Sequence, residues 1–463
     1  MNQLDLIIRK GKVVQQDACR QLDIGIRNGK IAALSENLVV SEETPVYDAE
    51  GLTILPGMID AHVHFNEPAL GHWEGFVTGS ASLAAGGCTT YIDMPLNGVP
   101  PTVRLSALEM KLNSAEGQSH VDYALWGGLV PGNVGELEGL AQAGVIGFKA
   151  FMSCPGGEGE DIFTEVDDET LVNGMKEIAR LGLVLALHAE SEEIVSKLTA
   201  EAVQAGKRSA LDFIATRPIA AEVEAVSRAL DYAEMTGCML HFVHISSAEA
   251  VQVIAKAKAQ GMDVTVETCP HYLTLTNVEV ERLGPVAKCA PPIRSVEDQA
   301  SLWEELKAGR FDIIASDHSP SPKHMKQGDF FAAWGGISGA QSTLELMLDE
   351  GHLRREVPLT ELARMLALEP AKRFGLYPRK GEIAIGADAD LALVDLAAGY
   401  TLQESDLLYR HKQSPYVGKA FGCSVKSTFL RGVNVYERGV GVGAALEGAW
   451  LRHSASIGGG LDG

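Results

Sequence analysis

The chain has 463 residues, of which 46% are hydrophobic and 22% are charged, and its formal net charge is −22 at pH 7. This length fits a barrel of roughly 250 or more residues with a smaller accessory domain. No apolar stretch is long enough to cross a bilayer, which argues against a membrane protein. The acidic balance disfavours nucleic acid and anionic membranes as partners, because both are recognised through clustered Lys and Arg.

The amino-terminal segment favours a cytoplasmic protein. Residues 1–12 lack the basic start, long apolar centre and small-residue cleavage site of a secretory signal. The seven cysteines are scattered without C-x-x-C spacing, so we expect neither a disulfide framework nor a thiolate zinc site. Any metal site must therefore use His, Asp, Glu or Lys.

The order of predicted elements indicates a (β/α)8 barrel of the TIM type. The first fifty residues read as short strands with an Asn28-Gly29 hairpin turn. Apolar strands then alternate with helical stretches such as 221–236 and 248–259, which is typical of parallel βαβ units. Eight strands, the number in such a barrel, are predicted at 53–60, 88–94, 121–126, 145–151, 183–188, 239–244, 263–267 and 312–317.

Beyond Gly381 the pattern becomes β-like again, at 381–385, 391–394 and 425–430. We expect these segments to join the amino-terminal strands in a small β-sandwich beside the barrel. The predicted domains are a sandwich of residues 1–52 and 380–440, a metallohydrolase barrel of residues 53–379, and a tail of residues 441–463. The Gly-rich residues 457–463 are expected to be mobile.

The strongest local signal is a pair of histidines on the first barrel strand. His62 and His64 are two residues apart, so their side chains emerge on the same face and can grip one metal ion. A pair of hydrogen-bonded structural histidines is the simpler alternative. Asp60 shares their face, where it can either accept a hydrogen bond from one imidazole or only cap the strand.

Other ligand-type side chains stand where later strands end. His188 and His244 close strands five and six, and Asp317 closes strand eight, at the end of a barrel where active sites lie. His241 and His318 point to the opposite face and are not counted. Taken singly, each candidate has a structural alternative, such as a packed histidine or a helix cap. Four histidines at three strand ends are hard to attribute to packing.

Lys149 lies in the predicted fourth strand among apolar residues. Burial of an ammonium group is costly, so this lysine must be paired, neutral or modified. A neutral lysine can react with carbon dioxide to give a carbamate, an anion that can bridge two divalent cations. The alternative is an ion pair with an Asp or Glu in the barrel mouth.

This order of residues resembles the ligand order of the cyclic-amidase branch of the amidohydrolase superfamily, which includes dihydroorotases and hydantoinases. His-x-His on strand one is followed by Lys on four, His on five, His on six and Asp on eight, and the likeness extends over residues 1–440. Within that branch, five segments resemble the allantoinase family, namely 72–75, 93–97, 288–294, 316–320 and 333–337.

The resemblance implies a two-metal hydrolase. His62, His64 and Asp317 would hold the more buried ion, His188 and His244 the other, and carbamylated Lys149 would bridge them. Zinc is the expected metal, although such ligands also accept cobalt, manganese or nickel. A hydroxide between the ions would attack the ring carbonyl of a small cyclic ureide, and Asp317 would pass a proton to the departing ring nitrogen. The family relatives also imply a homo-oligomer, commonly a tetramer.

The choice of substrate depends on residues around the mouth. Dihydroorotase relatives carry an arginine two residues after the second histidine, where it binds the substrate carboxylate, whereas this chain has Asn66. The change favours an uncharged hydantoin ring, unless Asn66 only caps the turn at Glu67 and Pro68, and allantoin as the ring is implied only by the family resemblance. The candidate substrate contacts are Asn97, Ala290, Ser319, Gly335 and Gly336.

Two other functions remain open at this point. A hydantoinase or dihydropyrimidinase would use the same metal site with different loops above it. A non-catalytic scaffold of the same fold would lack several ligands, whereas this chain has all six in order. Ala290 also replaces a serine that relatives often carry before the Pro-Pro pair, which matters only if that contact needs a hydroxyl group.

Overall fold

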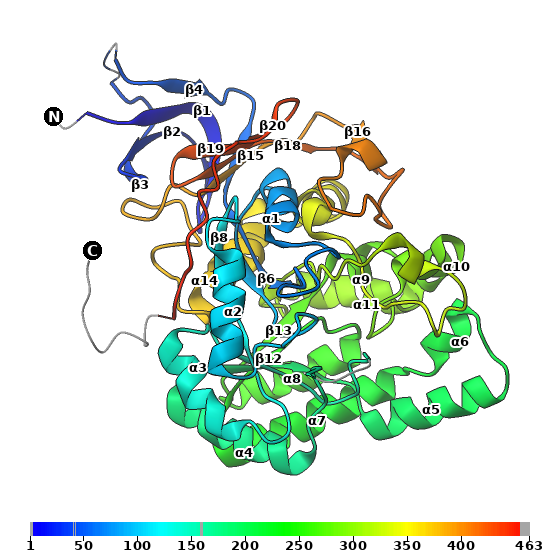
Figure 1. The fold of residues 1–463 in the computed structure, drawn as a ribbon. Helices are drawn as coiled ribbons and strands as arrows, with labels where there is room; N and C mark the ends of the chain where they lie inside the picture. Colours follow the sequence, from blue (N-terminus) through cyan, green and yellow to red (C-terminus); the bar gives the residue numbers. More distant parts are fainter. Residues whose placement is uncertain (1–2, 40, 42, 158–160, 454–463) are drawn as a thin grey trace.

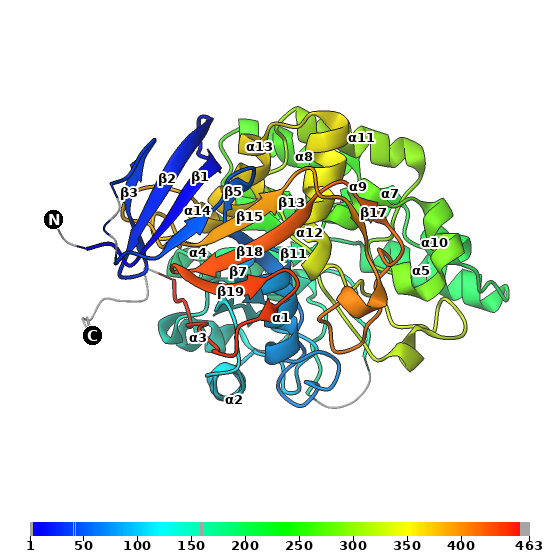
Figure 2. The same cartoon turned by 90° about the horizontal axis from the view of Figure 1, so that it is seen from above.

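The computed structural model describes residues 3–39, 41, 43–157 and 161–453. They form a (β/α)8 barrel beside a sheet that both ends of the chain build together (Figures 1 and 2). The predicted fold class is therefore confirmed. No helix within these ranges is long and apolar enough to span a bilayer.

The barrel closes through eight parallel positions within the described residues. His64 N–H donates to His318 O at 2.7 Å and so joins the first position to the eighth. The third position is interrupted at Trp126, which separates its two short strands. In chain order the strands are β6 (Met58–Val63), β7 (Cys88–Asp93), β8 (Asp122–Leu125) with β9 (Gly127–Gly128), β10 (Phe148–Phe151), β11 (Val184–His188), β12 (Met239–Phe242), β13 (Val264–Thr268) and β14 (Ile313–Ile314).

The predicted first and last barrel strands differ from the structure at their ends. The single strand predicted at 53–60 is wrong, because β5 (Thr53–Pro56) pairs with β1 (Leu6–Val14) and β15 (Leu391–Asp395) outside the barrel. The barrel strand starts only after Gly57. All residues of β5 and β6 are buried, and most are apolar, so hydrophobicity alone could not reveal which sheet they join. At the other end, regular pairing covers only β14, because the chain turns at Asp317.

Helices surround the barrel, and most lie on its outside (Figure 1). Local signals fix their ends: Asp167 caps α4 by accepting from Thr170 N–H at 2.8 Å, and Gly182 ends it in the left-handed conformation. The predicted helices at 221–236 and 248–259 are confirmed as α7 (Ile219–Thr236) and α8 (Ala248–Ala259). The others are α1 (Phe76–Ala85), α2 (Leu105–Ala115), α3 (Leu137–Ala143), α4 (Asp168–Leu181), α5 (Glu192–Gln204), α6 (Ala210–Ala215), α9 (Pro270–Thr274), α10 (Asn277–Leu283), α11 (Val296–Lys307), α12 (Thr343–Leu346), α13 (Leu359–Ala363) and α14 (Glu369–Arg373), with π-helical turns η5 (Met347–Leu353) and η6 (Arg364–Leu368).

Strands from both termini meet in one sheet, nine-stranded within the described residues. Its order is β20-β19-β18-β15-β5-β1-β2-β3, and β4 lies beside β1. A separate core of apolar side chains, including Ile24, Ile54 and Phe429, holds this sheet together. The strands not yet given are β2 (Cys19–Arg27), β3 (Lys30–Ser35), β4 (Val46–Asp48), β18 (Ser424–Leu430), β19 (Val433–Glu437) and β20 (Gly441–Val442), and a small hairpin adds β16 (Tyr400–Thr401) and β17 (Ala420–Phe421).

The segment after β20 runs back to the barrel (Figure 1, red). Tyr123 N–H donates to Ala449 O at 3.0 Å, and Leu451 N–H donates to Tyr123 O at 2.7 Å. Leu451 is buried in the same apolar cluster as Trp126 and Phe374. Part of the segment predicted as a tail therefore packs on the barrel, whereas residues 457–463 lie outside the described residues. The domain boundaries stay a prediction.

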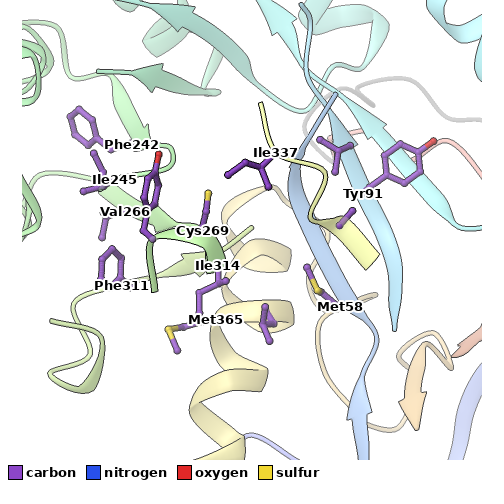
Figure 3. Close-up of a cluster of buried hydrophobic side chains, with 14 of the residues drawn as sticks. Met58, Tyr91, Phe242, Ile245, Val266, Cys269, Phe311, Ile314, Ile337 and Met365 are labelled. Atoms are coloured by element: carbon purple, nitrogen blue, oxygen red, sulfur yellow. The ribbon is translucent and has the colours of Figure 1, made fainter. Parts of the chain in front are cut away.

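A continuous apolar core joins the strands to the helices around them. Phe242, Val266 and Ile314 from β12, β13 and β14 belong to one buried cluster with Met365 of η6 (Figure 3). Burial of a large aliphatic or aromatic side chain stabilises a fold by about 1.5–3 kcal/mol. The outer faces of the strands thus hold the barrel together, which leaves their carboxyl ends free for polar side chains.

Candidate metal centre

Three of the predicted ligands converge on one carboxylate at the barrel mouth. Asp317 Oδ1 lies 3.2 Å from His62 Nε2 and 3.4 Å from His64 Nε2. These side chains come from β6 and from the turn after β14, which the barrel closure brings together. Ligand atoms of His62, His244 and Asp317 all lie within 4.8 Å of one another. The sequence prediction that these residues share one site agrees with this geometry.

The second pair of histidines lies against the first. His188 Nδ1 is 3.1 Å from His244 Nε2, and the ring centroids of His62 and His244 are 5.4 Å apart. His188 also stacks on Phe151, with ring centroids 4.5 Å apart and planes 14° apart. All four imidazoles are buried. Side chains from β6, β11 and β12 therefore form one continuous imidazole cluster.

The backbone at two of these strand ends adopts a conformation that side chains disfavour. His244 has φ 41° and Asp317 has φ 46°, and Asn66 and Asn97 on neighbouring loops have φ 67° and 69°. Left-handed conformations of non-glycine residues cost of the order of 1 kcal/mol or more and cluster at functional sites. Here the turn directs Asp317 back over the mouth instead of outward.

Lys149 is a buried amine among the candidate ligands. Its side chain is completely buried on β10, and Nζ has no hydrogen-bond partner. Burial lowers the pKa of Lys149 to about 7, because the charged ammonium loses its solvation. Nζ lies 4.9 Å from the centroid of the Phe151 ring. No carboxylate forms an ion pair with Lys149 among the described residues, so the alternative of a paired lysine is not observed.

The electrostatics of Asp317 favour the ionised carboxylate. Burial alone raises its pKa, but the neighbouring imidazoles of His62, His64 and His244 overcome that effect and hold the pKa of Asp317 well below its usual range. The side chain is 12% exposed and lines the cavity above the cluster. Asp317 can therefore hold a cation and also exchange a proton with a bound molecule.

Sequence reasoning missed the carboxylate beneath the histidines. Glu267 on β13 is fully buried. Its Oε1 lies 2.9 Å from His62 Nδ1, and its Oε2 lies 3.2 Å from His241 Nε2. His241 thus shares this carboxylate with His62, so the prediction that His241 points to the opposite face is wrong. The available signal was an acidic residue at the end of an apolar strand.

Asp60 takes the second of its two predicted roles. Its Oδ1 accepts from the backbone N–H of Ser316 at 3.0 Å and of His62 at 3.3 Å, and no imidazole bonds to it. Burial raises the pKa of Asp60 to about 7. Asp60 therefore ties β6 to the end of β14, while Glu267 orients the imidazole of His62.

A cavity of about 400 Å³ opens above the cluster. Its wall includes the five residues predicted to contact substrate, namely Asn97, Ala290, Ser319, Gly335 and Gly336. At Gly336, where φ is 137°, a Cβ atom would lie 2.4 Å from Ser319 O. Only glycine allows this loop to approach so closely.

Two lysines anchor the loop that carries Gly335 and Gly336. Lys288 Nζ donates to Phe331 O at 3.0 Å and also to Ala333 O. Lys326 Nζ donates to Trp334 O at 3.0 Å and also to Gly336 O. Both ammonium groups thus donate to backbone carbonyls, so their main role is to hold the loop in place in the cavity wall.

Asn66 does not line this cavity. Its side chain is buried and its Nδ2 donates to Pro320 O at 3.3 Å. It therefore joins the loop after β6 to the loop after β14. As the sequence suggested, this position offers no cation to a substrate carboxylate. The role of Asn66 is instead to hold the two loops together.

The residues present fit a pair of divalent metal ions. Imidazole nitrogens and a carboxylate face a common space, and this donor set suits zinc, cobalt, manganese or nickel. Lys149 Nζ is a buried polar atom without a partner beside that space. A carbamate on Lys149 would add a second anion to the carboxylate of Asp317, so the predicted donor set is chemically consistent.

Comparison with known proteins decides the family. The sequence profile of the amidohydrolase family matches residues 53–435. The chain belongs to the amidohydrolase family. Its relatives include the allantoinases of Deinococcus radiodurans and Rubrobacter xylanophilus, each 49% identical over 94% and 95% of this chain and 96% of theirs. The allantoinase of Escherichia coli K12 is 42% identical over 96% of this chain and 98% of its own. The predicted resemblance to allantoinases is confirmed.

Solved amidohydrolase-family structures share the fold. The L-hydantoinase (dihydropyrimidinase) of Arthrobacter aurescens superposes with a TM-score of 0.93 at 35% identity, over 97% of this chain and 100% of that one. The dihydropyrimidinase of Brevibacillus agri gives 0.89 at 30% identity, over 96% and 98%. The barrel and the terminal sheet are thus common to this amidohydrolase and to enzymes named for other rings.

Proposed function

We propose that this protein hydrolyses the cyclic amide of allantoin to allantoate, a step of purine breakdown. The observation that carries the reaction is the convergence of His62, His244 and Asp317 beside the unpaired Lys149. Nearly full-length identity of 42–49% to allantoinases supports allantoin as the ring.

The proposed centre uses two divalent ions, with zinc as the expected metal. His62, His64 and Asp317 would hold one ion, His188 and His244 the other, and carbamylated Lys149 both. When bound, the ions would polarise the ring carbonyl and lower the pKa of a bound water. In forming the carbamate, the Nζ lone pair would bond to the carbon of CO2 as one C–O π bond opens, and one N–H proton would pass to solvent water. The lowered pKa of Lys149 supplies the neutral amine that carbamate formation requires.

Asp317 moves the proton in the proposed reaction. Its carboxylate accepts a proton from water as the oxygen bonds to the ring carbonyl carbon. It then gives that proton to the ring nitrogen as the C–N bond breaks. Water is added across the bond, and the carboxylate is regenerated. The position of Asp317 in the cavity wall supports this role.

The cavity favours an uncharged substrate. Lys288 and Arg217 stand in its wall, but Lys288 donates to two carbonyls and Arg217 donates to Glu190 at 2.8 Å. An orotate-type carboxylate would therefore have to compete with Glu190 for Arg217 and with the two carbonyls for Lys288. We propose that Asn97, Ala290, Ser319, Gly335 and Gly336 contact the ring and its ureido tail, since all five line the cavity.

The first test is a side-by-side hydrolysis assay on allantoin, hydantoin, dihydrouracil and dihydroorotate, with metal counted per chain. The proposal requires a strong preference for allantoin and about two metal ions. Preference for hydantoin or dihydrouracil would instead agree with the names of the structural relatives, and that ring would then replace allantoin as the proposed substrate. If the protein hydrolyses none of the four rings and binds no metal, the non-catalytic scaffold becomes the favoured alternative. The homotetramer and the cytoplasmic location stay predictions.

A further inference from the structure

The surroundings of His188 contain a charged pair that the proposed reaction does not use. Glu190, just after β11, is fully buried. Its Oε2 lies 3.0 Å from His188 Nε2 and accepts from Arg217 NH1 at 2.8 Å. We infer that Glu190 and Arg217 act as a positioning pair that orients His188 toward its metal ion and so determines occupancy of the His188/His244 position. This inference rests on the proposed two-metal site.

The carboxylate selects the tautomer of His188. An ionised carboxylate only accepts hydrogen bonds, so the proton of the neutral ring must sit on Nε2. The lone pair is then on Nδ1, the atom that lies 3.1 Å from His244 Nε2. Stacking on Phe151 fixes the plane of the same ring. The ring is thus held by its face and by one nitrogen, and the other nitrogen points into the cluster.

Arg217 lets Glu190 perform this task without adding net charge. A buried carboxylate that lacks a cation would itself attract metal or a second proton. The guanidinium lies over the Phe213 ring at 5.2 Å, and Arg217 O accepts from Arg294 NH1. The cation is therefore anchored from both the side chain and the backbone, and Glu190 stays close to His188.

The other half of the site is arranged differently. Glu267 bonds to His62 and His241 and accepts from His244 N–H at 3.1 Å, and no Lys or Arg of the described residues forms an ion pair with it. The first metal position therefore has two carboxylates, Glu267 and Asp317, without an ion-paired Lys or Arg. The second metal position has instead a carboxylate whose charge is balanced by a guanidinium. Loss of Glu190 should accordingly affect one of the two metal positions and spare the other.

The experiment is a titration of metal-free, full-length protein with zinc, followed by calorimetry and by metal counts after gel filtration. We expect Glu190→Ala to bind one ion as tightly as the parent and the second about 10- to 100-fold more weakly, as is typical when the partner of a ligating histidine is lost. Glu190→Gln keeps an oxygen that can accept from His188, so it should retain more of the second ion than Glu190→Ala.

Matched variants separate positioning from folding. The double variant Glu190→Ala/Arg217→Met removes both charges, so it leaves no unpaired cation if Glu190→Ala fails to fold. Glu222→Gln is the control: Glu222 is equally buried and accepts from Ser246 N–H at 2.9 Å and from two serine hydroxyls, but it bonds to no candidate ligand. It should bind two ions with parental affinities.

The outcomes distinguish this inference from the proposed function. Two tightly bound ions in the parent and in both Glu190 variants would overturn the positioning role and leave the two-metal site intact. Equal weakening of both ions, or no advantage of Glu190→Gln over Glu190→Ala, would also overturn it. If the parent binds no metal, the proposed function itself fails, and the inference with it.

Discussion

Two groups of ligand-type side chains are buried within the part of the chain that the structure describes, and they differ in charge balance. His62, His244 and Asp317 meet at the barrel mouth, and Asp122, Asp388 and Asp390 meet between the barrel and the terminal sheet. In both groups the ligand atoms lie within 4.8 Å of one another. Distances alone would describe both as metal sites.

The group at the sheet already contains its cations. Lys380 Nζ lies 2.7 Å from Asp122 and 3.2 Å from Asp388, and it also bonds to Asp390. Burial alone lowers the pKa of Lys380, but the three carboxylates raise it above its usual range. Arg431 bonds to Asp122 as well. At the mouth, Lys149 Nζ has no hydrogen-bond partner among the described residues. Charge compensation, in addition to geometry, therefore distinguishes a catalytic cluster from a structural one.

Removal of the lysine at the mouth should have the largest effect. Lys149→Ala is expected to lose both metal ions and to lower kcat/KM by roughly 10,000-fold or more, since several kcal/mol of metal assistance disappear and each 1.36 kcal/mol is tenfold. Metal analysis and an allantoin assay would measure both losses. A small carboxylic acid should restore part of the activity. Full activity without additive would remove the bridging carbamate from the mechanism.

Asp317→Asn should separate binding from proton transfer. The amide keeps an oxygen toward His62 and His64, so much of the metal should stay bound. Turnover should fall by about 100- to 10,000-fold, the usual contribution of a general acid or base. Steady-state kinetics at matched metal content would test this. Parental turnover in the variant would assign the proton to another group.

Lys380→Met should produce the opposite pattern. Breaking a buried ion cluster leaves carboxylates uncompensated and typically costs about 3–5 kcal/mol. Urea unfolding should show a loss of that size, while the folded variant keeps two metal ions and its activity. If its stability were unchanged, the proposed contrast in charge compensation would be wrong.

The smallest predicted effect concerns the pH dependence of carbamate formation. Only the neutral amine reacts, so a pKa of about 7 for Lys149 means that the reactive fraction rises about tenfold from pH 6 to 8 and then levels off. An ordinary lysine would keep rising to about pH 10. Labelled CO2 at constant dissolved concentration and 13C NMR of the metal-free protein would follow the reaction. A continued rise above pH 8 would contradict the buried, neutral amine.

Period-two alternation and strand ends were enough to predict most of the site. His62 and His64 follow from their spacing on one strand, and His188, His244 and Asp317 follow from their places after apolar runs. The structure brings all of them together with Lys149. Barrel topology supplies the proximity, because the carboxyl ends of its strands meet at one mouth.

The features that the sequence did not predict depend on contacts between residues far apart in the chain, which no local pattern indicates. Glu267 and Glu190 contact histidines through packing between elements, and Arg217 reaches Glu190 from a loop more than twenty residues away. Thr53–Pro56 was assigned to the wrong sheet because a buried apolar run suits either sheet. Residues 448–451 carry no strand signature, so their bonds to the barrel could not be foreseen.

Those last bonds also constrain how the chain can fold during synthesis. β8 pairs with β7 on one edge, and the opposite edge at Tyr123 bonds to Ala449 and Leu451. The ribosome makes that partner long after the eight barrel positions have emerged. A nascent chain can therefore assemble the mouth, with its histidines, while one edge of β8 is still unprotected. Residues 449–451 therefore cover this edge of β8 only after all eight barrel positions have been synthesised.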